Sequence, residues 1–163
     1  MKTYYEISDL NNLKLAKIKY LVFGIVTLVL SLTIFFLEMF ERKTIYLALD
    51  VIVSISMIYN IVMGVFYILK SFLLRDKIRG NFIFNLKNKH QASDEVKYKN
   101  NFIKVLMIAS IPLAFSIFLM YILMFYYYSI GVYEVISFIV SLVLFITTIL
   151  SFIFLDDEKK IYE

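Results

Sequence analysis

Four long apolar runs constrain this chain more than any other feature of its sequence. They cover residues 21–40, 45–69, 105–128 and 132–155, and each contains at most one charged residue. About 20 helical residues are enough to cross a hydrocarbon core of roughly 30 Å. A barrel strand would alternate polar and apolar residues, but in these runs the odd and the even positions are both apolar. The runs therefore predict an all-α polytopic membrane protein with four transmembrane helices.

Composition excludes several other classes of protein. Hydrophobic residues make up 61% of the 163 residues, compared with roughly 45–50% in soluble domains. The absence of cysteine and the presence of a single histidine argue against disulfide scaffolds and zinc sites. No glycine-rich phosphate loop and no cluster of ionisable groups occurs within a span. We therefore expect no enzyme, no catalytic residues, no metal and no cofactor.

The connections between the runs are uneven in length. Residues 41–44 and 129–131 form short turns, whereas residues 70–104 form a long basic loop. We expect one membrane domain over residues 1–163, built as two helical hairpins joined by this loop and followed by an acidic tail, 156–163. The two hairpins suggest an internal repeat, but few of their residues match.

The long loop has helical features at both ends. Residues 70–79 contain no helix breaker, and Ser93 precedes two acids, a pattern typical of a helix start. The second and third spans are therefore expected to extend to about 45–79 and 94–128, forming a cytoplasmic stalk. A solvated loop with a small apolar patch is the alternative.

Lysine and arginine residues predict the orientation. Fifteen of them lie in the N-terminal segment, the long loop and the C-terminal tail, and two lie in the short turns. Because cytoplasmic loops are enriched in these residues, both termini and the long loop are expected to be cytoplasmic. The basic loop would lie on an anionic inner leaflet. It carries no nucleic-acid-binding motif, so we expect no nucleic acid partner.

Small and polar residues form stripes within the spans. They are Gly24, Thr27, Ser31 and Glu38; Ser56, Asn60 and Gly64; Ala109, Pro112 and Ser116; and Ser137, Ser141, Thr148 and Ser151. Such stripes favour close helix packing, with Asn60 bonded to a facing helix. The alternative is a wetted lining in an oligomer. Pro112 also predicts a kink.

Acidic residues gather near the predicted outer end. Glu38 and Asp50 are the main candidates, with Glu41 and Glu134 nearby. Asp50 lies inside its span, where a charge usually has a partner or a function. It is expected to pair with Arg42 or Lys43 or to reach up to the membrane interface. The alternative is a ring of acids that attracts cations.

Three functions remain open. The first is a small non-catalytic membrane protein of accessory or immunity type, which binds a membrane partner through its helices. The second is a homo-oligomeric pore or cation channel, and the third is a small transporter or lipid-binding protein. Candidate interaction or pore-lining residues are Glu38, Asp50, Asn60, Ser137, Ser141, Thr148 and Ser151. The frequent lysine, isoleucine and asparagine residues suggest an AT-rich genome and a bacterial source, hence a plasma membrane location.

Overall fold

The computed structural model describes residues 7–40, 47–79, 89–128 and 131–155. This part of the chain forms four helices: α1 (Ile7–Phe40), α2 (Leu47–Arg79), α3 (Lys89–Tyr127) and α4 (Val132–Phe154). Each holds a segment long and apolar enough to cross a membrane, at Lys14–Met39, Ala48–Leu74, Phe102–Tyr127 and Val132–Phe154. The prediction of an all-α protein with four candidate membrane spans is confirmed, which indicates a multi-pass membrane protein.

Two helices begin earlier than predicted. Helix α1 begins at Ile7, well before residue 21, because residues 7–20 contain neither glycine nor proline to end a helix. Helix α3 begins at Lys89, so Ser93 lies inside the helix and is not its N-cap. Gln91 and Ala92 are good helix formers and carry the helix across that position. Helix α3 also continues through Pro112.

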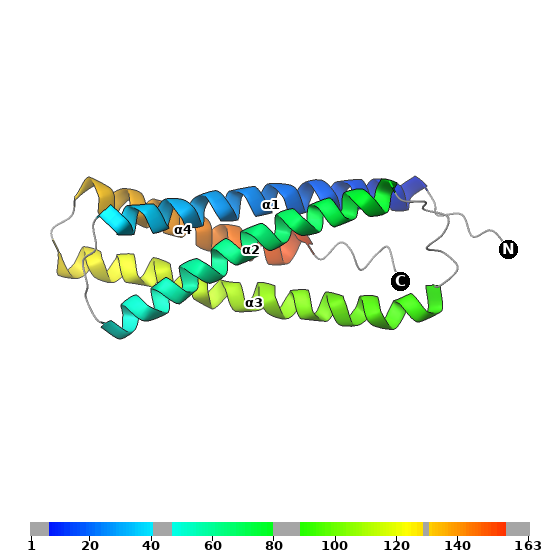
Figure 1. Ribbon diagram of the computed structural model, residues 1–163. Helices are drawn as coiled ribbons and strands as arrows, with labels where there is room; N and C mark the ends of the chain where they lie inside the picture. The colour runs from blue at the N-terminus through cyan, green and yellow to red at the C-terminus, as the bar shows by residue number, and fades with distance from the viewer. Residues whose placement is uncertain (1–6, 41–46, 80–88, 129–130, 156–163) are drawn as a thin grey trace.

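The four helices form one bundle in which each helix packs against two neighbours (Figure 1). Helices α3 and α4 are antiparallel, since Phe115 lies against Phe145 whereas Phe125, further along α3, lies against Phe138, earlier in α4. The diagonal pairs, α1 with α3 and α2 with α4, touch at few points. A ring of this kind is the arrangement of an antiparallel four-helix bundle.

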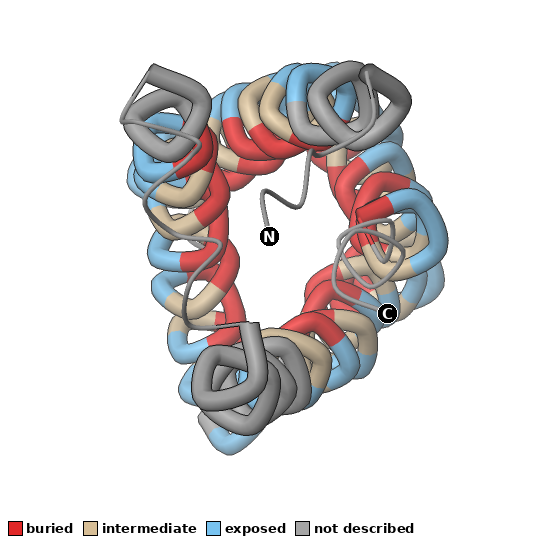
Figure 2. The backbone as a smooth tube through the Cα atoms, turned by 90° about the vertical axis from the view of Figure 1, so that its right-hand side faces the viewer, coloured by how far each residue is buried: buried red, intermediate tan, exposed pale blue. Residues whose placement is uncertain are grey.

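Each helix turns its buried face toward the bundle axis and its exposed face outward (Figure 2). The outward faces carry large apolar side chains, including Val22, Ile58 and Ile139, each about half exposed. Several buried positions are polar instead, among them Ser31, Asn60 and Ser141, which are fully buried. Apolar residues outside and hydroxyls inside suit a bundle that is surrounded by lipid.

Helices α1 and α2 approach most closely at two glycines. A Cβ atom on Gly64 would lie 2.8 Å from the backbone nitrogen of Leu28, and one on Gly24 would lie 2.9 Å from that of Ile68. These distances are shorter than any real Cβ contact. Small residues let two membrane helices approach this closely, so the predicted stripes of α1 and α2 do meet.

The predicted stripe of α3 meets α2 at one residue, since Oγ of Ser116 lies 2.9 Å from Oγ of Ser56, but the stripe is not the buried face of the helix. Pro112 is exposed, and Ala109 and Ser116 are only partly buried. The buried face instead carries Ser110 and Ala114, at 1% and 0% exposure. Small residues occur on two faces of α3, and the contacts with α2 and α4 decide which face is buried.

Candidate functional site

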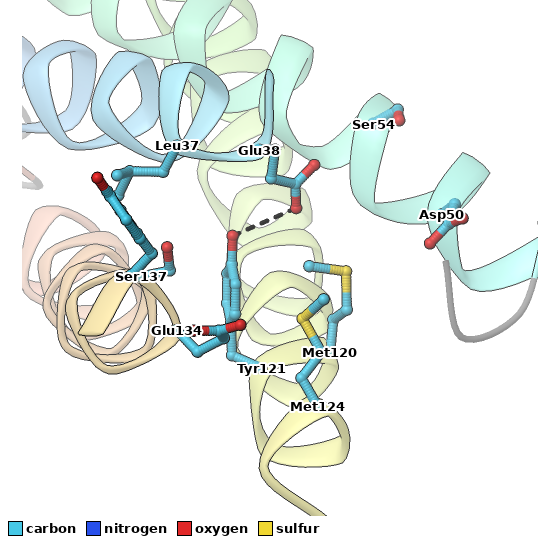
Figure 3. A pocket seen from close by; sticks show the side chains of 10 residues that line it. Leu37, Glu38, Asp50, Ser54, Met120, Tyr121, Met124, Glu134 and Ser137 are labelled. Atoms are coloured by element: carbon cyan, nitrogen blue, oxygen red, sulfur yellow. Dashed lines mark hydrogen bonds between the residues drawn. The ribbon is translucent and has the colours of Figure 1, made fainter. Parts of the chain in front are cut away.

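A pocket at one end of the bundle receives side chains from all four helices. Its interior holds about 30 Å³ of open space, room for a small group or a few waters. Its polar lining consists of Glu38, Asp50, Ser54, Tyr121, Tyr133, Glu134 and Ser137. We call it the acidic pocket, because three of these residues are carboxylates, each from a different helix (Figure 3).

Glu38 and Tyr121 face one another across the bundle (Figure 3). The Tyr121 hydroxyl donates a hydrogen bond of 3.3 Å to Oε1 of Glu38. Tyr121 itself is 3% exposed. Because α1 and α3 lie diagonally opposite one another, this bond orients the Glu38 carboxylate across the acidic pocket, toward α3.

Asp50 enters the pocket from the first turn of α2. The positive end of the helix dipole favours a carboxylate at this position. Its Oδ2 atom is buried and accepts no hydrogen bond. A buried carboxylate oxygen in this state is a strong acceptor for a donor that enters the pocket. Arg42 and Lys43, the predicted partners of Asp50, lie outside the described residues.

Glu134 folds back over the start of α4. Its Oε2 atom lies 2.5 Å from the point that a Cβ on Gly131 would occupy. Gly131 is the N-cap of α4 and offers no side-chain cap. A glutamate three residues after the N-cap can reach back toward the free backbone amides. Glycine at position 131 therefore makes room for the Glu134 carboxylate, which is 8% exposed.

The carboxylates of the pocket do not form a metal site. Among the described side chains, no three acidic or histidine groups are close enough to hold a metal ion. Divalent cations need several oxygens within about 2.6 Å. Three separated carboxylates with Tyr121 and two serines suit a larger cationic group that donates several hydrogen bonds, such as an ammonium or a guanidinium.

A second polar cluster lies at the opposite end of the bundle. Lys70 donates a 3.0 Å hydrogen bond to the Tyr20 hydroxyl, which donates to the Leu155 carbonyl at 3.3 Å. Lys19 reaches the Phe154 carbonyl at 3.5 Å. Cations favour the negative C-terminal end of a helix, so this cluster caps α4. We call this end, with Lys19, Lys70 and Tyr20, the lysine end.

The structure separates the predicted site residues into two groups. Glu38, Asp50 and Ser137 line the acidic pocket. Asn60, Ser141, Thr148 and Ser151 are buried elsewhere in the bundle. The Asn60 amide donates to the Ser56 carbonyl of its own helix at 2.8 Å, not to a facing helix as predicted. Ser151 lies 3.4 Å from the Tyr67 hydroxyl on the diagonal helix α2.

Four polar residues of the pocket were not among the candidates of the sequence analysis: Ser54, Tyr121, Tyr133 and Glu134. Tyr121 and Ser54 lie within apolar runs that carry no local signal for a site. Tyr121 is 83 residues from the carboxylate it contacts, so no spacing rule connects the two. Glu134 was noted as an acid of the same end but was not included among the candidates. One clue was its position shortly after the Gly131 turn.

Comparison of the chain with known protein families, with curated proteins and with solved structures finds no match. The function is therefore argued from the geometry of the acidic pocket.

Proposed function

We propose that this chain is a small non-catalytic integral membrane protein that binds a membrane partner, and that its acidic pocket receives a positively charged group of that partner. One observation carries the proposal: carboxylates from α1, α2 and α4 line a single pocket of about 30 Å³. Interaction proteins of accessory or immunity type need such a recognition site and no reactive centre.

The described charges are separated along the bundle. Glu38, Asp50 and Glu134 line the pocket at one end, whereas Lys19 and Lys70 cluster at the other. Because lysine-rich ends face the cytoplasm, we place the pocket at the outer surface of the plasma membrane. Both termini are then cytoplasmic, and the four spans form two hairpins joined on that side.

The same orientation places the extended ends of α2 and α3 in the cytoplasm. Helix α2 continues to Arg79 and α3 begins at Lys89, beyond the apolar segments that end at Leu74 and begin at Phe102. We propose that these ends form a short helical stalk. Its basic residues would contact the anionic lipids of the inner leaflet.

The chemistry of the pocket favours a single cationic side chain over a free metal ion. Asp50 offers a buried carboxylate oxygen without a hydrogen-bond donor, and Glu38 is already oriented by Tyr121. An arginine or lysine from a partner helix, inserted at the membrane surface, would donate to both. Charge-assisted hydrogen bonds in a partly buried site are about twice as strong as neutral ones.

The pore alternative keeps one supporting feature, since the same acids would attract cations to the mouth of a channel. It loses another, because Ser137, Ser141 and Ser151 face the interior of a single chain at 4%, 0% and 1% exposure. Those hydroxyls are not available to line a channel between copies.

Co-purification from native membranes tests the proposal. Wild-type protein is expected to retain a partner, and Asp50→Asn is expected to reduce its recovery by about tenfold or more, since a charge-assisted bond is lost. Lys14→Gln is the matched control. It removes the charge of an exposed lysine that does not line the pocket. Equal recovery with Asp50→Asn and with wild type would refute the proposal.

A further inference from the structure

The buried apolar residues fall into two separate clusters. One, nearer the lysine end, contains Tyr20, Met63, Tyr67 and Met107. The other, nearer the acidic pocket, contains Ile34, Met57, Ala114 and Leu144. Along every helix, buried polar residues lie between the members of the two clusters. They are Thr27, Ser31, Asn60, Ser110, Thr147, Thr148 and Ser151, and all are at most 7% exposed. We call this set the central polar layer.

Side chains in the layer bond within their own helices. Ser31 donates to the Thr27 carbonyl at 2.7 Å, and Ser110 donates to the Met107 carbonyl at 2.6 Å. Thr148 likewise donates to the Phe145 carbonyl at 2.7 Å. One member bonds across the bundle, since Oγ of Ser151 lies 3.4 Å from the Tyr67 hydroxyl of α2. For Thr27 and Asn60, the described residues show no side-chain hydrogen bond to another helix.

Two buried oxygens in the layer have no hydrogen-bond partner: Oγ1 of Thr27 and Oδ1 of Asn60. Thr27 is 1% exposed and Asn60 is 0% exposed. By contrast, the Thr33 hydroxyl of the same helix donates to the Val29 carbonyl at 2.8 Å. Buried polar atoms are nearly always satisfied by protein or by ordered water, so these two atoms point to a ligand.

The two residues lie within about one helical turn of the same contact between α1 and α2. Gly64 packs against Leu28, the residue after Thr27. Asn60 lies one helical turn from Gly64 on the same face of α2. Thr27 can both donate and accept, while Asn60 Oδ1 only accepts. A water molecule supplies the donor that Asn60 needs and a partner of either kind for Thr27.

We propose that the central polar layer is a binding site for ordered water in the middle of the membrane, held by Thr27 and Asn60 between the two apolar clusters. This site is distinct from the acidic pocket and does not depend on any partner. The bound water supplies the hydrogen bonds that Oγ1 of Thr27 and Oδ1 of Asn60 do not find among the described residues. It thereby places a hydrated contact between α1 and α2. This contact can rearrange while the buried groups stay hydrogen-bonded.

Water-edited solid-state NMR of the full chain in lipid bilayers tests this site directly. Magnetisation from water should reach the Asn60 side-chain amide well before it reaches the backbone amide of Ile117. Ile117 is fully buried in the apolar cluster nearer the acidic pocket. Asn60→Leu identifies the resonance. Equal build-up at Asn60 and Ile117 would overturn the proposal.

An isosteric substitution provides the second readout. If water is bound, Thr27→Val removes one of its partners and should raise the equilibrium constant for unfolding by about fivefold. If the layer is dry, the same change removes an unsatisfied hydroxyl and should lower that constant, which contradicts the proposal. Thr33→Val is the matched control, since its hydroxyl bonds to its own helix outside the layer.

Discussion

The Tyr121 hydroxyl on α3 donates a 3.3 Å hydrogen bond to Glu38 on α1, across the diagonal of the bundle. A second tyrosine spans the other diagonal near the opposite end, where the Tyr67 hydroxyl lies 3.4 Å from Oγ of Ser151. Diagonal helices otherwise touch at few points. The two tyrosines therefore connect helix pairs that packing alone leaves apart, and one of them orients a carboxylate of the acidic pocket.

Tyr121→Phe is expected to destabilise the folded protein by about 1–3 kcal/mol, because a hydrogen bond to an acidic group is lost while the ring remains. Unfolding in mild detergent measures the change. Tyr126→Phe is the control, since Tyr126 is 83% exposed and should leave stability unaltered. An equal effect of both substitutions would show that the hydroxyl of Tyr121 contributes nothing specific.

Gly64→Ala is expected to destabilise the contact between α1 and α2 by about 1–3 kcal/mol, the usual range for overpacking. The new Cβ would lie 2.8 Å from a backbone nitrogen, which cannot move as a flexible side chain does. Alanine has a better helix propensity than glycine. A loss of stability would therefore come from the close approach of the two helices. Val62→Ala, on the outward face at 58% exposure, should have little effect on the same unfolding curve.

Tyr20→Phe is expected to loosen the end of α4. The substitution removes the hydroxyl that donates to the Leu155 carbonyl and accepts from Lys70. Hydrogen exchange at the Leu155 amide, which bonds to the Ser151 carbonyl, should become about fivefold faster. Tyr59→Phe removes a bond to Leu106 on α3 instead, and exchange at Leu155 should then stay as in the wild type.

Orientation is open to a direct labelling experiment, because the chain contains no cysteine. A membrane-impermeant maleimide should label Tyr126→Cys in intact cells and label Lys14→Cys only after the membrane is permeabilised. Both positions are exposed in the bundle. The reverse labelling pattern would place the acidic pocket on the cytoplasmic side and contradict the proposed topology.

The helical spans could be predicted from sequence because hydropathy is a local property, and the apolar runs lie within the observed helices apart from a few terminal residues. The buried face of α3 could not, since small residues such as Ala109 and Ala114 occur on both of its faces and only neighbouring helices select one. The contact between Glu38 and Tyr121 depends on how α1 and α3 are placed in the bundle, and no spacing rule in the sequence predicts that placement.

The most direct test of the acidic pocket uses the methionines that line it. In the full chain labelled with ¹³C-methyl methionine, titration with methylguanidinium should shift the Met120 and Met124 methyl signals along a saturating curve. Met63 and Met107, buried in the apolar cluster near the lysine end, should not move. Asp50→Asn should flatten the curve. Shifts of equal size at all four methionines, or none at Met120 and Met124, would contradict the proposal that the pocket binds a cationic group.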